Sequence, residues 1–146
     1  MELNYIVKGL ELIGTTVKEL KIENSIIDIE RDAKRSFGLE INEPVFEEID
    51  DEIYAQMTID FDVEISQLED EECRIHLSME GAFCSDKEVE LDTFKELVII
   101  NGAAALVGIA RGKLEALSAN IFNGGKVVIP FVNVIDYYKE MVENEK

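Results

Sequence analysis

The sequence predicts an α+β fold, in which a four-stranded antiparallel sheet is followed by two helices packed on one of its faces. Three observations lead to this prediction. Apolar and polar residues alternate strictly from Ile53 to Ser66, neighbouring segments alternate as well, and the apolar spacing becomes helical after Ser85. Strands that come first and helices that come last are typical of α+β folds. A chain of 146 residues has the size of one domain, so residues 1–146 are expected to form a single domain.

The clearest strand in the sequence is the stretch from Ile53 to Ser66. Its apolar residues alternate with polar ones throughout, and only a strand sends alternate residues to opposite faces. Alternation, in place of a continuous apolar run, indicates an antiparallel sheet with one dry face and one face in water. The wet face would carry Asp60, Asp62 and Glu64, so we expect it to be acidic.

The N-terminal part of the chain is predicted to form another strand of this sheet. Residues 3–24 alternate, and Gly9 and Gly14 interrupt the pattern where bends or bulges are expected. Towards the end of this segment Glu19 and Glu23 would point outward. They would add two acids to the wet face.

Two further segments complete the predicted meander. Residues 37–49 form a strand in which Pro44, which has no N–H, marks an edge position or a bulge. Residues 74–84 alternate again and place His76 on the outer side. From residue 37 to residue 72 the chain has fourteen acids and no Lys or Arg. The outer face of the sheet is therefore expected to be strongly negative.

The last third of the chain is predicted to be helical. Thr93 can cap a helix over 94–121, where apolar residues mostly recur at helical spacing. Asn101-Gly102 could be a hairpin turn, but the Ala-rich text beside it favours a kink or break between two helical pieces. The glycine turn at 123–125 ends this stretch. Residues 133–143 are predicted to form a final amphipathic helix with Val134, Tyr137, Tyr138 and Met141 on its inner side.

The composition excludes several classes of function. With 14 basic and 32 acidic residues the formal charge is −18, which argues against binding nucleic acid or anionic membranes. Such a charge attracts basic partners, although plain solubility explains it equally well. Cys73 and Cys84 are expected to be reduced, structural thiols of a cytoplasmic protein. No signal peptide is visible, and the most apolar window, Leu97–Ala110, has 14 residues, too few to span a bilayer.

Residues that carry catalysis are scarce. His76 is the single histidine, and an exposed structural role is the commoner one at such a position. One histidine and two cysteines without a CxxC motif do not make a zinc set. The many carboxylates lie along strand faces and turns, where solvation explains them. The sequence therefore predicts neither an enzyme nor a cofactor or metal site.

The order of elements and several motifs resemble the SecB-type protein-export chaperones over about Tyr5 to Met141. The motifs that carry the resemblance are Ala110-Arg111, the glycine turn Asn123-Gly124-Gly125, Pro130, Asn133 at the start of the last helix, Glu80-Gly81-Ala82-Phe83 and residues 17–24. Glu80-Gly81-Ala82-Phe83 resembles the end of the family's last strand, and residues 17–24 resemble its first strand. The chain departs from the family at Ala103 and Gly108, where prolines are typical.

The resemblance implies an ATP-independent chaperone that holds unfolded polypeptides and favours their unfolded state by mass action. It implies a four-stranded sheet backed by two helices, and a homotetramer built as a dimer of dimers, or a dimer. It also implies that Glu19 and Glu23 help to dock the export ATPase SecA. Since His76 stands where the family has another docking acid, the resemblance supports client holding more firmly than SecA docking.

Client-binding residues are predicted at the boundary between sheet and helices, because one monomer has more apolar side chains than it can bury. The candidates are Phe61, Phe83, Leu106 and Phe122. The competing interpretation places them in the core, and it is favoured for the two phenylalanines that point inward on strands. A basic partner is predicted on the acids of the wet face. The alternative function, from a different class, is an α+β domain that binds a small apolar ligand and has no chaperone activity.

Overall fold

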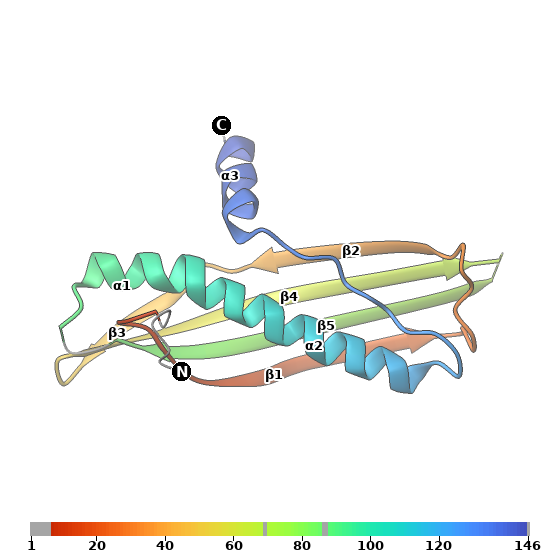
Figure 1. Cartoon of the computed structure of the whole chain (residues 1–146), viewed down its shortest axis with the longest axis horizontal. Helices are drawn as coiled ribbons and strands as arrows, with labels where there is room; N and C mark the ends of the chain where they lie inside the picture. Colours follow the sequence, from red (N-terminus) through yellow and green to blue (C-terminus); the bar gives the residue numbers. More distant parts are fainter. Residues whose placement is uncertain (1–6, 69, 86–87, 146) are drawn as a thin grey trace, which may run out of the picture.

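A computed structural model of the chain describes residues 7–68, 70–85 and 88–145, so residues 3–6 of the first predicted strand lie outside the described residues. The strands are β1 (Glu11–Asn24), β2 (Lys34–Ile41), β3 (Val45–Ile49), β4 (Glu52–Gln67) and β5 (Glu71–Cys84). The helices are α1 (Leu91–Leu97), the π-helical turn η1 (Val98–Gly102), α2 (Ala103–Ile121) and α3 (Val134–Asn144). The α+β prediction, with the strands first, is therefore confirmed (Figure 1).

The strands form one antiparallel sheet in the order β1-β5-β4-β2, and β3 also pairs with β4. Ile41 of β2 lies opposite Ile59, whereas Val45 of β3 lies opposite Gln56, so the register shifts by one residue between them. Such a shift exchanges the two faces, as a β-bulge does. Pro44 lies in the break. Because β2 and β3 follow each other along the same side of β4, they act as one interrupted edge strand, which is why four strands were predicted where five are found.

The two central strands have the predicted dry and wet faces. Along β4 and β5 buried residues alternate with more exposed ones over nearly the whole length. The edge strand β1 differs, because its large apolar inward side chains remain between 39% and 44% exposed: these are Leu12, Val17, Leu20 and Ile22. The dry face of the sheet thus extends further than the described part of the chain covers it.

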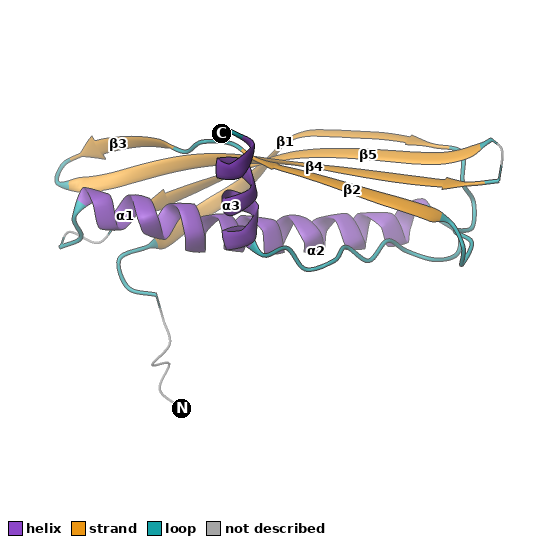
Figure 2. Cartoon of the chain, turned by 90° about the horizontal axis from the view of Figure 1, so that it is seen from above, coloured by secondary structure: helices purple, strands orange, loops and turns teal. Residues whose placement is uncertain are grey.

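The helices α1, η1 and α2 form one rod that crosses the dry face diagonally (Figures 1 and 2). The interruption predicted at Asn101-Gly102 is a π-helical turn, not a hairpin. Gly102 permits close packing there, because a Cβ at this position would lie 3.2 Å from the Phe83 ring. The rod begins at Leu91 without a side-chain cap, so the prediction of a cap at Thr93 is wrong; this residue lies inside the first turn.

The rod is longer than the sequence argument assumed. Leu91–Ile121 has 31 residues and is long and apolar enough, by length and composition alone, to cross a membrane. The prediction that no segment can span a bilayer rested on the window Leu97–Ala110, which is only part of this rod. A core helix passes the same test, and Phe94, Val98 and Leu106 of this rod are fully buried in the core. One face of the rod thus packs on the sheet, and 39% of its most apolar 18-residue window is buried.

An extended segment, residues 122–133, runs back along α2 towards the β2 side of the sheet (Figure 1). Side chains of α2 hold its backbone. The Ser118 hydroxyl accepts a hydrogen bond from the Val127 N–H at 2.9 Å, and the Glu115 carboxylate accepts one from the Ile129 N–H at 3.2 Å. This segment sets the point from which α3 starts.

The last helix lies beside the β2 edge and points away from the strands (Figure 1). Asn133 is its N-cap, with the side-chain oxygen 3.1 Å from the Asp136 N–H, a bond that satisfies one of the free amides of a first turn. The predicted helix at 133–143 is thus confirmed within one residue at each end. Of the residues of α3, Val134 alone is buried.

Candidate functional site

The four residues predicted to hold clients lie in the core. Their exposed fractions are 1% for Phe61, 1% for Phe83, 0% for Leu106 and 5% for Phe122. Leu106 packs on the backbone of Gly81, and the ring of Phe83 packs on Gly102. Side chains buried this completely offer no surface to a polypeptide in solution. The competing core interpretation describes their positions, and the apolar surplus of the chain must be sought elsewhere.

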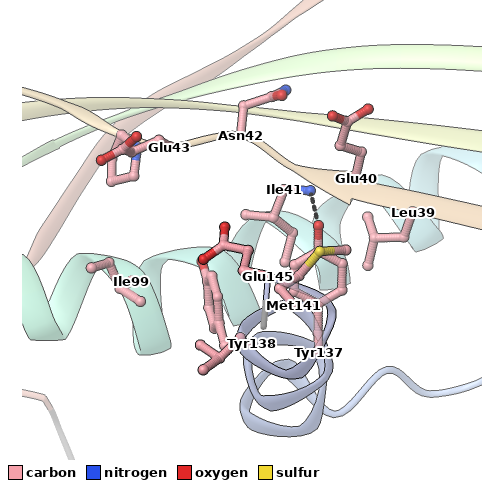
Figure 3. Close-up of a pocket in the computed structure, with 12 residues that line it drawn as sticks. Leu39, Glu40, Ile41, Asn42, Glu43, Ile99, Tyr137, Tyr138, Met141 and Glu145 are labelled. Carbon is pink, nitrogen blue, oxygen red and sulfur yellow. Dashed lines mark hydrogen bonds between the residues drawn. The ribbon is translucent and has the colours of Figure 1, made fainter.

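An open apolar groove of about 620 Å³ lies between α3 and the β2–β3 connection (Figure 3). η1 contributes Ile99 to its floor. The other apolar side chains that line it are Leu39, Ile41, Pro44, Tyr137, Tyr138, Met141 and Val142. Polar side chains are few, and three of them, Glu40, Glu43 and Glu145, are carboxylates. We call this feature the α3 groove.

Two adjacent tyrosines fix the helical wall of the α3 groove. Their rings meet edge to face, with centroids 5.5 Å apart and planes at 84°, an arrangement that aromatic quadrupoles favour. The Tyr137 hydroxyl accepts a hydrogen bond of 2.9 Å from the Ile41 N–H at the end of β2 (Figure 3). Among the described residues this is the one hydrogen bond between α3 and the sheet.

The second tyrosine is in a different state. The Tyr138 hydroxyl is buried and has no hydrogen-bond partner among the described residues. Burial, and to a smaller extent the neighbouring Tyr137, raises the pKa of Tyr138. A buried hydroxyl without a partner costs free energy. The wall of the groove therefore holds a donor that a bound molecule could satisfy.

The groove continues into the free edge of β2. Successive N–H groups of a strand point to opposite sides, and the Asn42 N–H donates to Thr58 of β4 at 3.0 Å. The N–H groups of Phe37 and Leu39 therefore point the other way, as that of Ile41 does, towards the side of β2 where no strand pairs in the described chain. Such an edge is a template for an added strand.

The five acids predicted to bind a partner lie on the outer face of the sheet, on β1 and β4. Glu19 and Asp60 both lie opposite Ser78 of β5, and Asp62 lies opposite His76. In the next row Glu23 and Glu64 lie on either side of Arg74. Carboxylates of β1 and β4 thus lie on either side of β5, with Arg74 between two of them and Lys21 of β1 paired with Glu19 at 3.2 Å.

His76 lies among three of these carboxylates. Its Nδ1 is 2.8 Å from Asp62 Oδ1, and its Nε2 is 3.8 Å from carboxylate oxygens of Glu19 and Asp60. No group of three or more His, Cys, Asp or Glu side chains in the described ranges is arranged to hold a metal ion. The cluster is a set of polar contacts on an open face, and the Lys21–Glu19 ion pair lies beside it.

Sequence reasoning missed the residues of the α3 groove. Tyr137, Tyr138 and Met141 were predicted on the inner side of the last helix, and these three side chains do line the groove. Their signal was therefore present. The amphipathic pattern of the helix does not show against which edge of the sheet the helix lies.

Comparisons with known proteins bear on the fold. No protein-family model matches the chain, and no curated protein matches it in sequence. Among solved structures it is similar to a SecB-like chaperone from Mycobacterium tuberculosis, solved in complex with a peptide from an antitoxin. The TM-score is 0.58 at 8% identity, over 85% of this chain and 91% of that one. The chain therefore shares the fold of a SecB-like chaperone over most of its length, and this likeness concerns the fold alone.

Proposed function

We propose that the chain is an ATP-independent holdase chaperone of the cytoplasm, which binds unfolded polypeptides at the α3 groove and the free edge of β2. The observation that carries the proposal is the continuity of these two features on one side of the sheet. The similar SecB-like structure was solved with a peptide bound, which supports a polypeptide as the ligand. A holdase needs no catalytic residues, so the proposed role is binding and not catalysis.

The chemistry of the site suits an extended chain. The backbone of an added strand would pair with the free amides of Phe37 and Leu39, and its alternate side chains would enter the apolar groove. Main-chain hydrogen bonds do not depend on sequence, so they allow many clients. The carboxylates of Glu40, Glu43 and Glu145 line the same groove, and we expect them to favour clients that carry Lys or Arg near the apolar residue.

The test is suppression of aggregation of a chemically unfolded protein in the absence of nucleotide. Wild type is compared with Met141→Asp, which places a charge in the groove, and with Ile135→Asp as the matched control. Both residues lie on α3 and are similarly exposed, 42% and 49%, but Ile135 does not line the groove. We expect Met141→Asp to lose most of the protection and Ile135→Asp to retain it. Equal loss of protection in both variants would reject the site. No protection by wild type would reject the function.

We propose in addition that the acidic outer face recruits a basic partner, with the basic tail of SecA as the candidate if the protein serves export. Glu19, Glu23, Asp60, Asp62 and Glu64 support this by their outward positions. The pair of substitutions Glu19→Lys and Glu23→Lys should weaken SecA binding, most at low salt, and leave client holding unchanged. Absence of wild-type affinity at low salt would place the protein in another pathway.

The uncovered dry face of β1 supports a homo-oligomer, and we propose a tetramer or a dimer. β1 is an edge strand whose inward residues are about two-fifths exposed, and a second copy paired along this edge would cover them. The outward side of α2 has little bulk at Gly108 and Gly112, where a Cβ would meet nothing within 4 Å. Light scattering that shows only a 16.5 kDa monomer at micromolar concentration would reject this proposal.

A small apolar ligand is the second candidate occupant. The volume of the α3 groove, about 620 Å³, lies within the range of small-molecule sites. A ligand-binding protein would co-purify with its ligand and be indifferent to unfolded chains. Mass spectrometry of the purified protein, together with the aggregation assay, separates the two functions.

A further inference from the structure

We propose that Tyr137 is an intramolecular competitor of the client: its hydroxyl occupies the last free amide of the β2 edge and thereby holds the α3 wall of the groove close to β2. A client strand that runs along β2 as far as Ile41 must displace this hydroxyl, and α3 then moves outward as the wall of a wider groove. This inference rests on the proposed function, because it concerns how the same site opens. It goes beyond that function by assigning a switch to one named contact.

The geometry of the contact is that of strand addition. The Ile41 N–H points to the free side of β2 and donates to the Tyr137 hydroxyl at 2.9 Å, as it would donate to the backbone carbonyl of a paired strand. The tyrosine oxygen thus stands where a client carbonyl would stand. The two acceptors exclude each other, because one N–H at this distance satisfies one of them.

The docked position of α3 is weakly held. The contact with Ile41 is its one hydrogen bond to the sheet among the described residues. Val134 is the one buried residue of the helix, Tyr137 and Tyr138 are partly buried against the core, and Ile135 and Val142 remain about half exposed. A helix with so little buried surface belongs to the part of a structure that opens at low free-energy cost.

Outward movement of α3 also removes an unsatisfied buried hydroxyl of the docked state. While the helix is docked, the Tyr138 hydroxyl is buried without a partner. Once the helix moves outward, water or the client backbone can satisfy it. In the docked state the Ile41 amide has an acceptor and the Tyr138 hydroxyl has no partner. In the open state a client carbonyl accepts from the Ile41 amide, and the Tyr138 hydroxyl is hydrated. A client that supplies a carbonyl to the Ile41 amide therefore shifts the balance towards the open state.

The experiment measures the affinity of wild type, Tyr137→Phe and Tyr138→Phe for a fluorescein-labelled peptide that alternates valine and lysine. Tyr137→Phe removes the competing acceptor and keeps the ring, so we expect affinity to rise roughly two- to tenfold, the range of one net hydrogen bond. Tyr138→Phe removes the same atom one residue later, where it makes no hydrogen bond. This control should bind no more tightly than wild type.

A second measurement needs no substitution. Hydrogen exchange of the amides in α3 is followed in wild type with and without the peptide. We expect faster exchange when the peptide is bound, because α3 then lacks its hydrogen bond to Ile41. Slower exchange would mean that α3 clamps the client, and unchanged or weaker affinity of Tyr137→Phe would mean that its hydroxyl is no competitor. Either result overturns the switch while the proposed function stands. If wild type does not bind the peptide at all, the function fails and the switch with it.

Discussion

Removal of the Leu106 side chain tests whether the residues first considered for client binding are core. Leu106 is fully buried, and its side chain lies directly on Gly81 of β5. Leu106→Ala leaves a cavity and should cost about 2–5 kcal/mol of unfolding free energy. The opposite change, Gly81→Ala, adds a methyl group that would stand 2.9 Å from Leu106 Cδ1 and should cost about 1–3 kcal/mol by overpacking.

The double variant makes the test specific. In Leu106→Ala/Gly81→Ala the new methyl group enters the space that the leucine leaves, so the combined cost should fall at least about 1 kcal/mol below the sum of the single costs. Urea unfolding followed by circular dichroism at one fixed protein concentration measures all four proteins, since an oligomer's stability depends on concentration. Strict additivity would refute the contact. Unchanged stability of Leu106→Ala with weaker client binding would return this residue to the client surface.

Three further predictions concern the rest of the fold. Cys84 should react with an alkylating reagent in the native protein and Cys73 only after unfolding, because Cys73 is buried and Cys84 is partly exposed. Burial raises the pKa of both thiols, with the Glu11 charge adding to the effect at Cys84. The unfolded state therefore loses these protons first, so a urea-unfolding series should show stability falling as pH rises above 9.0 towards the raised values; a rise would contradict the assigned burial. Asn133→Ala should destabilise α3 by about 0.5–2 kcal/mol, seen as faster amide exchange confined to that helix.

The sheet could be predicted from the sequence because its signal is local. In β4 and β5 every second residue faces the core, so the period of two reveals strand and face together, and Asp60, Asp62 and Glu64 were correctly placed outward. Pro44 marked the edge strand because it cannot donate to a ladder. The helix start could not be read in the same way, since Thr93 has a capping residue's chemistry but lies inside a helix that begins at Leu91.

The candidate site could not be predicted because it depends on how distant segments meet. Tyr137 and Ile41 are 96 positions apart in sequence, and nothing in either segment specifies the other. Leu106 and Phe122 looked available because the sequence does not state how much of the dry face the α1–α2 rod covers, whereas a core position was already the favoured interpretation for Phe61 and Phe83. Large apolar side chains do remain exposed in the described ranges, on α3 and β1 and most of all at Phe131 in the segment before α3, whereas the four residues chosen are buried.

The most direct test of client binding at the β2 edge is the exchange of individual backbone amides, observed by NMR, when an unfolded client is added without nucleotide. The amides of Phe37 and Leu39 should become protected, since the client strand would accept hydrogen bonds from them. Those of β1, on the opposite edge of the sheet, should not respond to the client. Protection that appears only along β1, or nowhere in the sheet, would contradict binding at the β2 edge and the α3 groove.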